Sequence, residues 1–308
     1  MSAAIEIAGL TKVYGEKRAL DGVDLTVPTG SVFGFLGPNG AGKTTTLRVL
    51  TGLAAPSGGE ARVFGHDVVS ATNQVRADIG FLPDVPGYYE WMTAPEFLRF
   101  AGSLFGIGGR VLDERVEALL DLAGLAGVRQ KIGGYSRGMK QRLGVAQALI
   151  NAPKLLMLDE PTSALDPIGR KEVLDMIASL GGRTTVFFST HILSDVERVC
   201  DTVAILHEGR VVTQAPIGEL KSRYGTSKLV VGVTEGADAL MASFAAEPWA
   251  ADVARGDNGS IEITVADLAS ARHAVPAMVT AAGVGLTRFE SGEVSLEEVF
   301  VDLVGGER

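Results

Sequence analysis

The chain has 308 residues, of which 46% are hydrophobic and 21% are charged, and this composition excludes an intrinsically disordered protein. Its length exceeds the usual ~100 to 200 residues of one domain, so we expect two domains. Most of the net charge of −9 comes from residues 226–308, which hold 5 Lys or Arg against 13 Asp or Glu, so we expect no nucleic-acid partner.

The cysteine count and the hydropathy pattern indicate the redox compartment of the protein and whether the chain crosses a membrane. The single cysteine, Cys200, excludes an intramolecular disulfide and favours a reducing compartment such as the cytosol. No apolar run reaches the ~18 residues of a membrane-spanning helix. The first residues lack a basic cluster ahead of an apolar stretch, so we expect no cleavable secretory signal.

The first thirty residues predict two strands. Segments 5–15 and 19–30 alternate apolar and polar residues and are separated by charged turn residues. This alternation is typical of antiparallel strands with one buried face. We therefore expect an antiparallel β lobe at the edge of the fold.

A glycine-rich loop, GPNGAGKTT at 37–45, follows the apolar segment 31–36 and precedes a helical pattern. It satisfies the P-loop pattern in the strand–loop–helix setting that this motif requires, which argues against a glycine-rich turn with a chance Lys and Thr. Glycines let backbone N–H groups close around phosphate oxygens, and the helix N-terminus adds its positive dipole end. Lys43 would supply a charge to the β and γ phosphates, and the Thr44 hydroxyl would ligate Mg²⁺. The predicted nucleotide-binding residues of the loop are Gly37, Asn39, Gly40, Ala41, Gly42, Lys43, Thr44 and Thr45.

Residues from about 88 to 150 predict a helical insertion. Thr93 and Glu96 stand at capping-box spacing ahead of an apolar-periodic stretch that ends in glycines at 106–109. A second helix is expected over 111–125, and a third follows Ser136.

Two more apolar segments, KLLMLDEP at 154–161 and TTVFFST at 184–190, alternate with helical patterns. This order predicts an α/β fold with a parallel sheet flanked by helices. Asp159 and Glu160 come at the carboxyl end of the first of these strands, beside the position expected for the P-loop. Asp159 would hold the magnesium shell, and Glu160 would orient and deprotonate an attacking water.

A boundary is expected near residues 221–227, where a strand pattern starts again. We therefore expect a nucleotide-binding domain over 1–220 and an accessory domain over 221–308. The order β-α-β-β-α-β in the second part predicts a small ferredoxin-like α+β unit. Pro276 is expected to interrupt its second helix.

Together these motifs resemble the nucleotide-binding subunit of an ATP-binding cassette (ABC) transporter. The resemblance covers residues 5 to about 220, and the motifs follow one another in the family's order. They are Tyr14 after the first strand, GPNGAGKTT, YSRGMKQR from Tyr135, LLMLDEP, SALD at 163–166, and His191 in STHILSDVE. So many separated motifs in order are more specific than a P-loop alone.

The resemblance implies roles for further residues. Tyr14 would stack on adenine, although an aromatic residue after a short strand also commonly packs. Ser136 and Gly138, at the start of a helix, would face the γ-phosphate held by a second subunit's P-loop. His191 would hold the attacking water in line with Glu160. One chain carries both halves of such a site but cannot close them on itself, which implies a second copy or a similar ATPase subunit as partner.

By resemblance, the protein is an ATPase subunit of an exporter of the drug-resistance and natural-product type. MgATP would close the dimer, closure would move a separate transmembrane permease subunit, and hydrolysis would reset it. The chain would lie at the cytoplasmic face of the plasma membrane, held there by the permease. The C-terminal domain would contact its twin or regulate dimer opening, or serve only as a stabilising appendage.

The signature differs from the family's usual LSGGQ at Tyr135, Arg137 and Met139. Arg137 adds a charge and removes the backbone freedom of glycine, whereas Ser136 and Gly138 are kept. We expect a working site.

A second departure is Asp84, where the family's glutamine loop has Gln. Ionised Asp only accepts hydrogen bonds, yet it would still reach a magnesium-bound water. The aromatic residues Tyr88, Tyr89 and Trp91 would lie near the surface that receives the permease, or pack beneath the helical insertion.

Two other functions remain open from the sequence. One is a soluble ABC-type ATPase that acts on ribosomes or nucleic acid, which would usually carry two cassettes or basic surfaces. The other is a nucleotide-dependent binding module without hydrolysis, against which Glu160 and His191 argue because both serve turnover rather than affinity.

Overall fold

The computed structural model describes residues 2–224, 227–256, 259–292 and 295–305. The chain divides into two compact units, Met1–Ile217 and Gly218–Arg308. The first unit has two sheets and two buried apolar clusters, and the second unit has one of each. No helix in the described ranges is both long and apolar enough to cross a bilayer.

A six-stranded sheet forms the centre of the first unit, in the order β10-β9-β3-β8-β7-β6. Its strands are β3 (Val32–Leu36), β6 (Ile79–Leu82), β7 (Leu155–Asp159), β8 (Thr185–Thr190), β9 (Thr202–His207) and β10 (Arg210–Pro216). All neighbours are parallel except β10, which pairs antiparallel with β9. Every residue of β3, β7 and β8 is buried, as expected of strands covered on both faces.

The antiparallel lobe predicted from the first thirty residues is confirmed. It is a second sheet, in the order β2-β1-β4-β5, with β1 (Ala3–Tyr14), β2 (Lys17–Pro28), β4 (Gly58–Val63) and β5 (His66–Asp67). Phe33 and Phe35 of β3 belong to the same apolar cluster as Ile5 of β1 and Leu47 of α1 (Lys43–Leu50). This cluster therefore joins the lobe and α1 to one face of the central sheet. The short helix α2 (Thr72–Asp78) leads from the lobe into β6.

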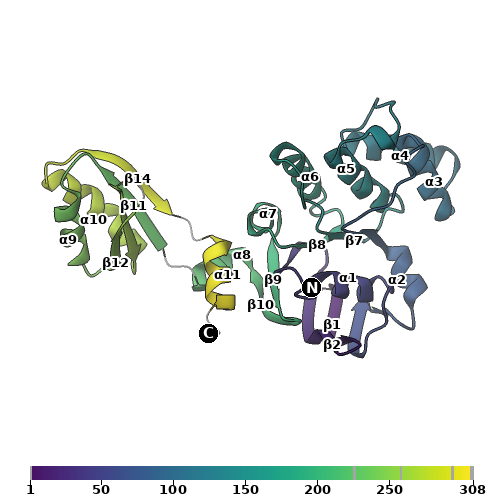
Figure 1. Ribbon diagram of the computed structural model, residues 1–308, viewed down its shortest axis with the longest axis horizontal. Coiled ribbons are helices and arrows are strands. Elements are labelled where there is room, and N and C mark those ends of the chain that lie inside the picture. The colour runs from purple at the N-terminus through teal and green to yellow at the C-terminus, as the bar shows by residue number, and fades with distance from the viewer. Residues whose placement is uncertain (1, 225–226, 257–258, 293–294, 306–308) are drawn as a thin grey trace. The chain divides into compact units, whose positions relative to one another are not determined.

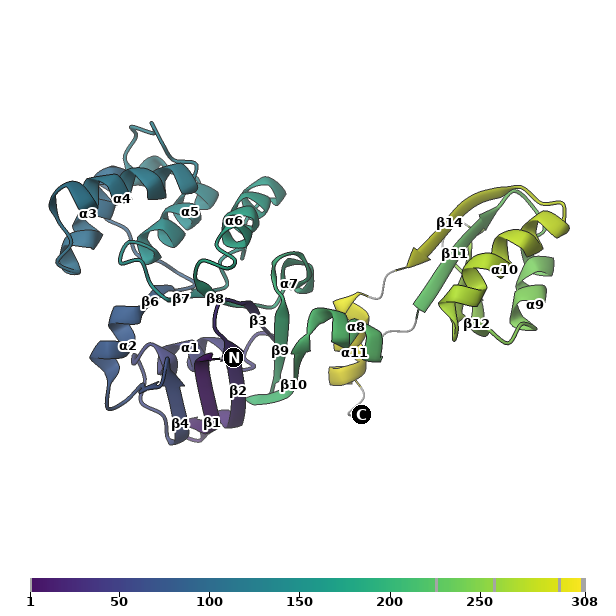
Figure 2. The ribbon, with the colours of Figure 1, turned by 180° about the vertical axis from the view of Figure 1, so that it is seen from behind.

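Helices cover the other face of the central sheet, through side chains such as Leu156, Leu158 and Phe188. They are α3 (Ala94–Leu104), α4 (Gly109–Leu122), the 3₁₀ turn η1 (Ile132–Gly134), α5 (Arg137–Ala148), α6 (Pro167–Ser179) and α7 (Leu193–Val199). Figures 1 and 2 show α3, α4 and α5 on the side of the central sheet opposite to β1, β2 and β4. The predicted capping box is confirmed, because the Thr93 side chain and the Glu96 side chain each bind the other's backbone N–H.

The second unit has the predicted β-α-β-β-α-β order. After α8 (Ile217–Tyr224) come β11 (Ser227–Val233), α9 (Ala237–Ala245), β12 (Ala250–Arg255), β13 (Ile261–Val265), α10 (Leu268–Ala281), β14 (Leu286–Gly292) and α11 (Leu296–Gly305). The sheet order is β12-β13-β11-β14, and every pair is antiparallel. Alternate residues of β11 and β13 pack with Phe244 of α9 and Val275 of α10.

Pro276 lies inside α10, so the prediction that it interrupts this helix is wrong. The buried residues Ala271, Val275 and Val279 recur every four positions and face the unit's core. Their burial offsets the ~3 kcal/mol that proline costs within a helix.

Candidate functional site

The parallel strands bring three loops to one edge of the central sheet. Leu36 of β3 pairs with Thr190 of β8, and Asp159 of β7 pairs with Ser189. The P-loop after β3, the turn after β7 and the loop after β8 therefore begin side by side. In open α/β sheets, ligands bind in the crevice outside this edge.

The P-loop adopts a backbone conformation that only glycine takes without strain. Gly40 and Gly42 have φ of 84° and 115°, and a Cβ at Gly37 would collide with the Leu206 carbonyl oxygen. Gly42 is the N-cap residue of α1, so the loop ends on a helix N-terminus. Lys43 is only 5% exposed, and its Nζ donates to the Gly37 carbonyl oxygen at 2.6 Å.

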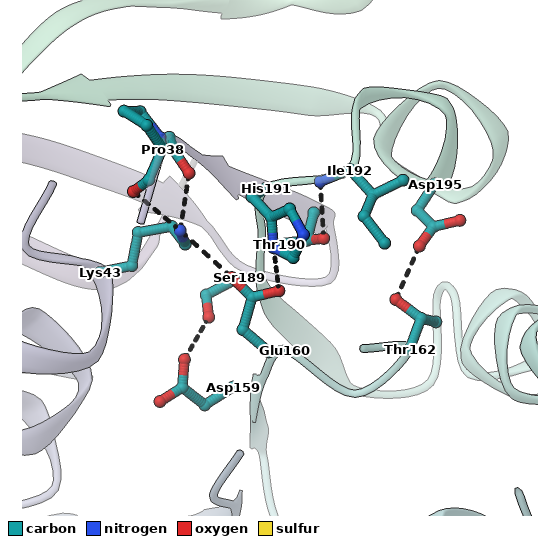
Figure 3. Close-up of polar contacts among 11 residues, drawn as sticks. Pro38, Lys43, Asp159, Glu160, Thr162, Ser189, Thr190, His191, Ile192 and Asp195 are labelled. Atoms are coloured by element: carbon teal, nitrogen blue, oxygen red, sulfur yellow. Dashed lines mark hydrogen bonds and ion pairs between the residues drawn. The ribbon is translucent and has the colours of Figure 1, made fainter. Parts of the chain in front are cut away.

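Glu160 lies between Lys43 and His191 (Figure 3). Its Oε1 is 3.1 Å from Nζ of Lys43, and its Oε2 is 2.8 Å from Nδ1 of His191. The backbone of Glu160 is left-handed, with φ of 49°, a conformation that costs a non-glycine residue ~1 to 3 kcal/mol and persists only where its surroundings impose it. The Glu160 N–H donates to the Ser189 carbonyl oxygen at 3.0 Å, which helps to fix this turn.

Asp159 is buried, with 1% of its surface exposed. Burial raises the pKa of its carboxyl, and hydrogen bonds from Ser189 and Thr44 only partly oppose the rise. The charges of Glu160 and Asp84 raise the pKa further. The Ser189 hydroxyl donates to Oδ1 of Asp159 at 2.6 Å and so fixes the carboxylate (Figure 3).

Oxygen donors suitable for Mg²⁺ gather beside the P-loop. The Thr44 hydroxyl lies near enough to the Asp159 carboxylate to lower its pKa, and the charge of the nearby Asp84 raises that pKa. Oxygen ligands of this kind fit a hard cation. Among the described residues, no group of three or more His, Cys, Asp or Glu could hold a metal. A magnesium ion here would therefore need phosphate oxygens and waters as further ligands, as is usual for this ion.

A cavity of about 290 Å³ opens over the P-loop. It is lined by Tyr14, Lys17, Ala19, Asn39, Gly40, Gly42, Lys43, Thr44, Thr45, Asp84 and Glu160. Tyr14 is 45% exposed, and the Lys12 Nζ lies 4.7 Å from the centre of its ring. The structure thus brings Tyr14 and Asp84 to the same cavity as most of the P-loop, whereas Gly37 and the buried Ala41 are not among its lining residues.

Ser136 and Gly138 are not among the residues that line this cavity. Ser136 is the N-cap of α5, and its Oγ accepts from the Met139 N–H at 3.2 Å. Gly138 is buried, and a Cβ there would lie 3.4 Å from the Cα of Gly169 on α6. The substitution at Arg137 therefore leaves the serine cap intact.

The aromatic residues after Asp84 divide between the two interpretations given above. The Tyr88 ring packs edge-on against Phe97, and its hydroxyl donates to the Lys140 carbonyl oxygen at 2.6 Å. By contrast, Trp91 is 64% exposed and Tyr89 is also exposed. Tyr88 thus packs within the helical insertion and Trp91 faces solvent, whereas Tyr89 is half-exposed and its ring also packs edge-on against Phe100.

Four residues near the site were missed by reasoning from sequence. Lys17 and Ala19 line the cavity, Ser189 fixes Asp159, and Asp195 forms a buried hydrogen bond with Thr162. For Ser189, a polar residue inside the apolar run TTVFFST was a usable signal.

Known proteins are similar to this chain over most of its length. The model of the family "ABC transporter" matches residues 20–163, and that of "ATP-binding protein DrrA1-3-like, C-terminal domain" matches residues 216–304. The chain is 39% identical to the ABC transporter ATP-binding protein YxlF of Bacillus subtilis, over 97% of this chain and 99% of that protein. It is 38% identical to the daunorubicin/doxorubicin resistance ATP-binding protein DrrA of Streptomyces peucetius, over 98% and 92% of the two chains. With the bacitracin transport ATP-binding protein BcrA of Bacillus licheniformis, identity is 42% over 72% and 73%.

Solved structures are similar to the larger part of the chain. The cbiO1 protein of Clostridium perfringens, described as part of the ABC transporter complex cbiONQ, superposes with a TM-score of 0.66 at 26% identity. That match covers 73% of this chain and 93% of cbiO1. The ATP-binding cassette MJ0796, solved as a dimer in a post-hydrolysis state with ADP and Pi, gives a TM-score of 0.62 at 26% identity, over 69% and 98% of the two chains.

Proposed function

The chain belongs to the ATP-binding proteins of ABC transporters and is an ATPase, and from this premise we propose that Glu160 is its general base and His191 the residue that aligns the attacking water. The observation that carries the proposal is the Glu160 carboxylate, held within 3.1 Å of Lys43 and 2.8 Å of His191 at the edge of the sheet where the P-loop begins. A base in this position can take a proton from a water beside the γ-phosphate. Near this point Lys43 offsets the charge that develops on the phosphate oxygens.

Magnesium is proposed as the cofactor, with Thr44 and Asp159 as its protein ligands and Asp84 acting through a bound water. When bound, Mg²⁺ supplies charge neutralisation across the β and γ phosphates. The pairing of Thr44 with Asp159 supports this assignment because it sets a hydroxyl and a carboxylate side by side next to the phosphate loop.

We propose that the working unit is a dimer of nucleotide-binding domains, each within residues 1–220. Each P-loop would face Ser136 and Gly138 of the other copy, or of a similar ATPase subunit. The serine-capped N-terminus of α5 supports this proposal, because backbone N–H groups there favour an anion. Residues 221–308 are proposed as an accessory domain, since all residues that line the cavity come from the first unit.

The transporter is proposed to be an exporter. Two relatives carry the names bacitracin transport and daunorubicin/doxorubicin resistance, and none of the relatives reported above favours an ATPase that acts on ribosomes or nucleic acid. The partner would be a separate transmembrane permease, which would hold this chain at the cytoplasmic face of the plasma membrane. Co-purification from membranes with a polytopic membrane protein tests this; recovery with ribosomes instead would contradict it.

The site assignment is tested with Glu160→Gln. We expect turnover to fall by at least ~10²-fold, the scale of a general base, while ATP still binds and holds the dimer closed. Steady-state ADP release and size-exclusion chromatography with ATP measure the two effects. Near-normal turnover in this variant would refute the role of Glu160.

A further inference from the structure

A buried carboxylate outside the nucleotide cavity joins the two segments that carry Glu160 and His191. Asp195 lies on α7, four residues after His191, and is 1% exposed. Its Oδ2 accepts from the Thr162 hydroxyl at 2.6 Å, and Thr162 is two residues after Glu160 (Figure 3). Its Oδ1 accepts from Nε of Arg170, on α6, also at 2.6 Å.

Asp195, Thr162 and Arg170 hold three segments of the chain together, and we call this cluster the clamp. A buried carboxylate must be paired and hydrogen-bonded, so its position is dictated by its partners. Arg170 supplies the opposite charge and also donates from its terminal nitrogen to Ser194, the neighbour of Asp195. Thr162 supplies the hydroxyl donor from the turn after β7. The carboxylate therefore holds α7 against both α6 and that turn.

The turn after β7 needs such support. Glu160 has left-handed φ, and the turn closes through the Ser163 N–H, which donates to the Glu160 carbonyl oxygen at 3.1 Å. On the opposite side, the Ile192 N–H donates to the Thr190 hydroxyl at 3.0 Å, which bends the chain away from β8 just after His191. Sheet hydrogen bonds fix where both loops begin, and the Thr162–Asp195 bond fixes their separation farther out.

We propose that Asp195 and Thr162 are positioning residues for hydrolysis, because their hydrogen bond sets the separation between the turn that carries Glu160 and the loop that carries His191. This proposal rests on the roles assigned to Glu160 and His191 above. Misalignment of reacting groups by ~1 Å, caused by a change away from the chemistry, costs ~10²-fold in rate. The clamp does not touch the cavity that receives the nucleotide, so its loss should lower kcat and leave ATP binding in place.

The test uses the full-length chain and changes one hydroxyl. Thr162→Val keeps the shape of the side chain and removes the hydroxyl that donates to Asp195, whereas Thr162→Ser keeps a hydroxyl donor. We expect Thr162→Val to lower kcat for ATP hydrolysis at least ~10-fold with KM within about twofold, and Thr162→Ser to recover most of the rate. Thr184→Val is the matched control, because Thr184 is also buried but donates to the Pro153 carbonyl oxygen at the other end of β8. Its kcat should not change.

A double-mutant cycle separates alignment from general structural damage. If Thr162 acts by aligning His191 with Glu160, Thr162→Val should cost less than about twofold in a His191→Ala background, measured by single-turnover hydrolysis of labelled ATP. An equal loss in both backgrounds, a rise in KM at unchanged kcat, or failure of Thr162→Ser to recover the rate would overturn the proposal. Normal turnover in both Glu160→Gln and His191→Ala would instead refute the site assignment on which it rests.

Discussion

Asp159 lies at the carboxyl end of β7 with 1% of its surface exposed, and this burial raises the pKa of its carboxyl. Ionised Asp159 therefore opposes folding, since the charge is held where water cannot solvate it. An asparagine would have the same shape, would carry no charge, and its amide oxygen would still accept from Ser189. The charge that would serve the proposed magnesium site therefore lowers the free energy of unfolding of the protein.

We expect Asp159→Asn to unfold at a higher temperature than the wild type at neutral pH, measured by calorimetry without Mg²⁺ or nucleotide. Each ~1 kcal/mol gained raises Tm by ~2 to 4 °C in a domain of about 150 to 250 residues. ATP hydrolysis should fall at least ~10-fold in the same variant. An unchanged or lower Tm would contradict the argument from burial.

Tyr14 offers a half-exposed ring to the cavity over the P-loop, where we propose that the nucleotide binds. If it stacks on the base, Tyr14→Ala should weaken ATP binding ~5- to 150-fold, since a base–aromatic stack contributes ~1 to 3 kcal/mol. Tyr14→Phe should bind normally, and GTP should lose as much affinity as ATP because every base has a π face. Titration with fluorescent nucleotides measures all three, and an effect of Tyr14→Ala confined to thermal stability would show that the ring only packs.

Among the elements, α3 begins with reciprocal bonds between Thr93 and Glu96. The Glu96 carboxylate accepts from the Thr93 N–H at 2.8 Å and from the Thr93 hydroxyl at 2.9 Å. The bond from the Thr93 N–H is the main cause that holds the pKa of Glu96 below its ordinary 4.5. Because the folded-state pKa is lowered, this stabilisation is fully present above pH 4.5 and disappears as the pH falls through the folded-state value.

Glu96→Ala should therefore unfold at lower urea concentration than the wild type at pH 7. The two midpoints should converge as the pH is lowered through 4.5, and equilibrium unfolding followed by circular dichroism at several pH values measures this. A difference between the two urea midpoints that stays constant with pH would mean that the charge of the Glu96 carboxylate does not stabilise the cap.

Sequence patterns within short segments predicted local structure correctly. They could not predict hydrogen bonds between residues that are far apart in the chain. The capping box of α3 and the P-loop are each encoded within about ten consecutive residues, and the alternation in β1 and β2 needs only its own segment. The bonds from Ser189 to Asp159 and from Thr162 to Asp195 span 30 and 33 residues, so they depend on the register of β7 against β8. At Pro276 the prediction failed for a different reason. The rule that proline interrupts a helix was outweighed by the burial of apolar side chains along α10.

At the scale of the whole molecule, the parts of the proposed site are divided between two places. The P-loop, Glu160 and His191 meet at the sheet edge, whereas Ser136 caps a helix whose end does not line that cavity. This division is what a site completed by a second copy requires.

Mixing two defective chains tests the shared site. Lys43→Ala disables the P-loop and Ser136→Arg disables the serine-capped helix end, so each variant alone should have both composite sites impaired. A mixed dimer would contain one site with both defects and one with none. Single-turnover hydrolysis should therefore recover on mixing, and a mixture as inactive as its components would contradict a site shared between copies.

The left-handed backbone at Glu160 bears on which residue evolution keeps at this position. Glycine adopts positive φ with less strain than glutamate, so Glu160→Gly would relax the turn while removing the proposed base. Because the strained backbone by itself would favour glycine, a glutamate would be kept at this position by its proposed role in hydrolysis and not by the turn.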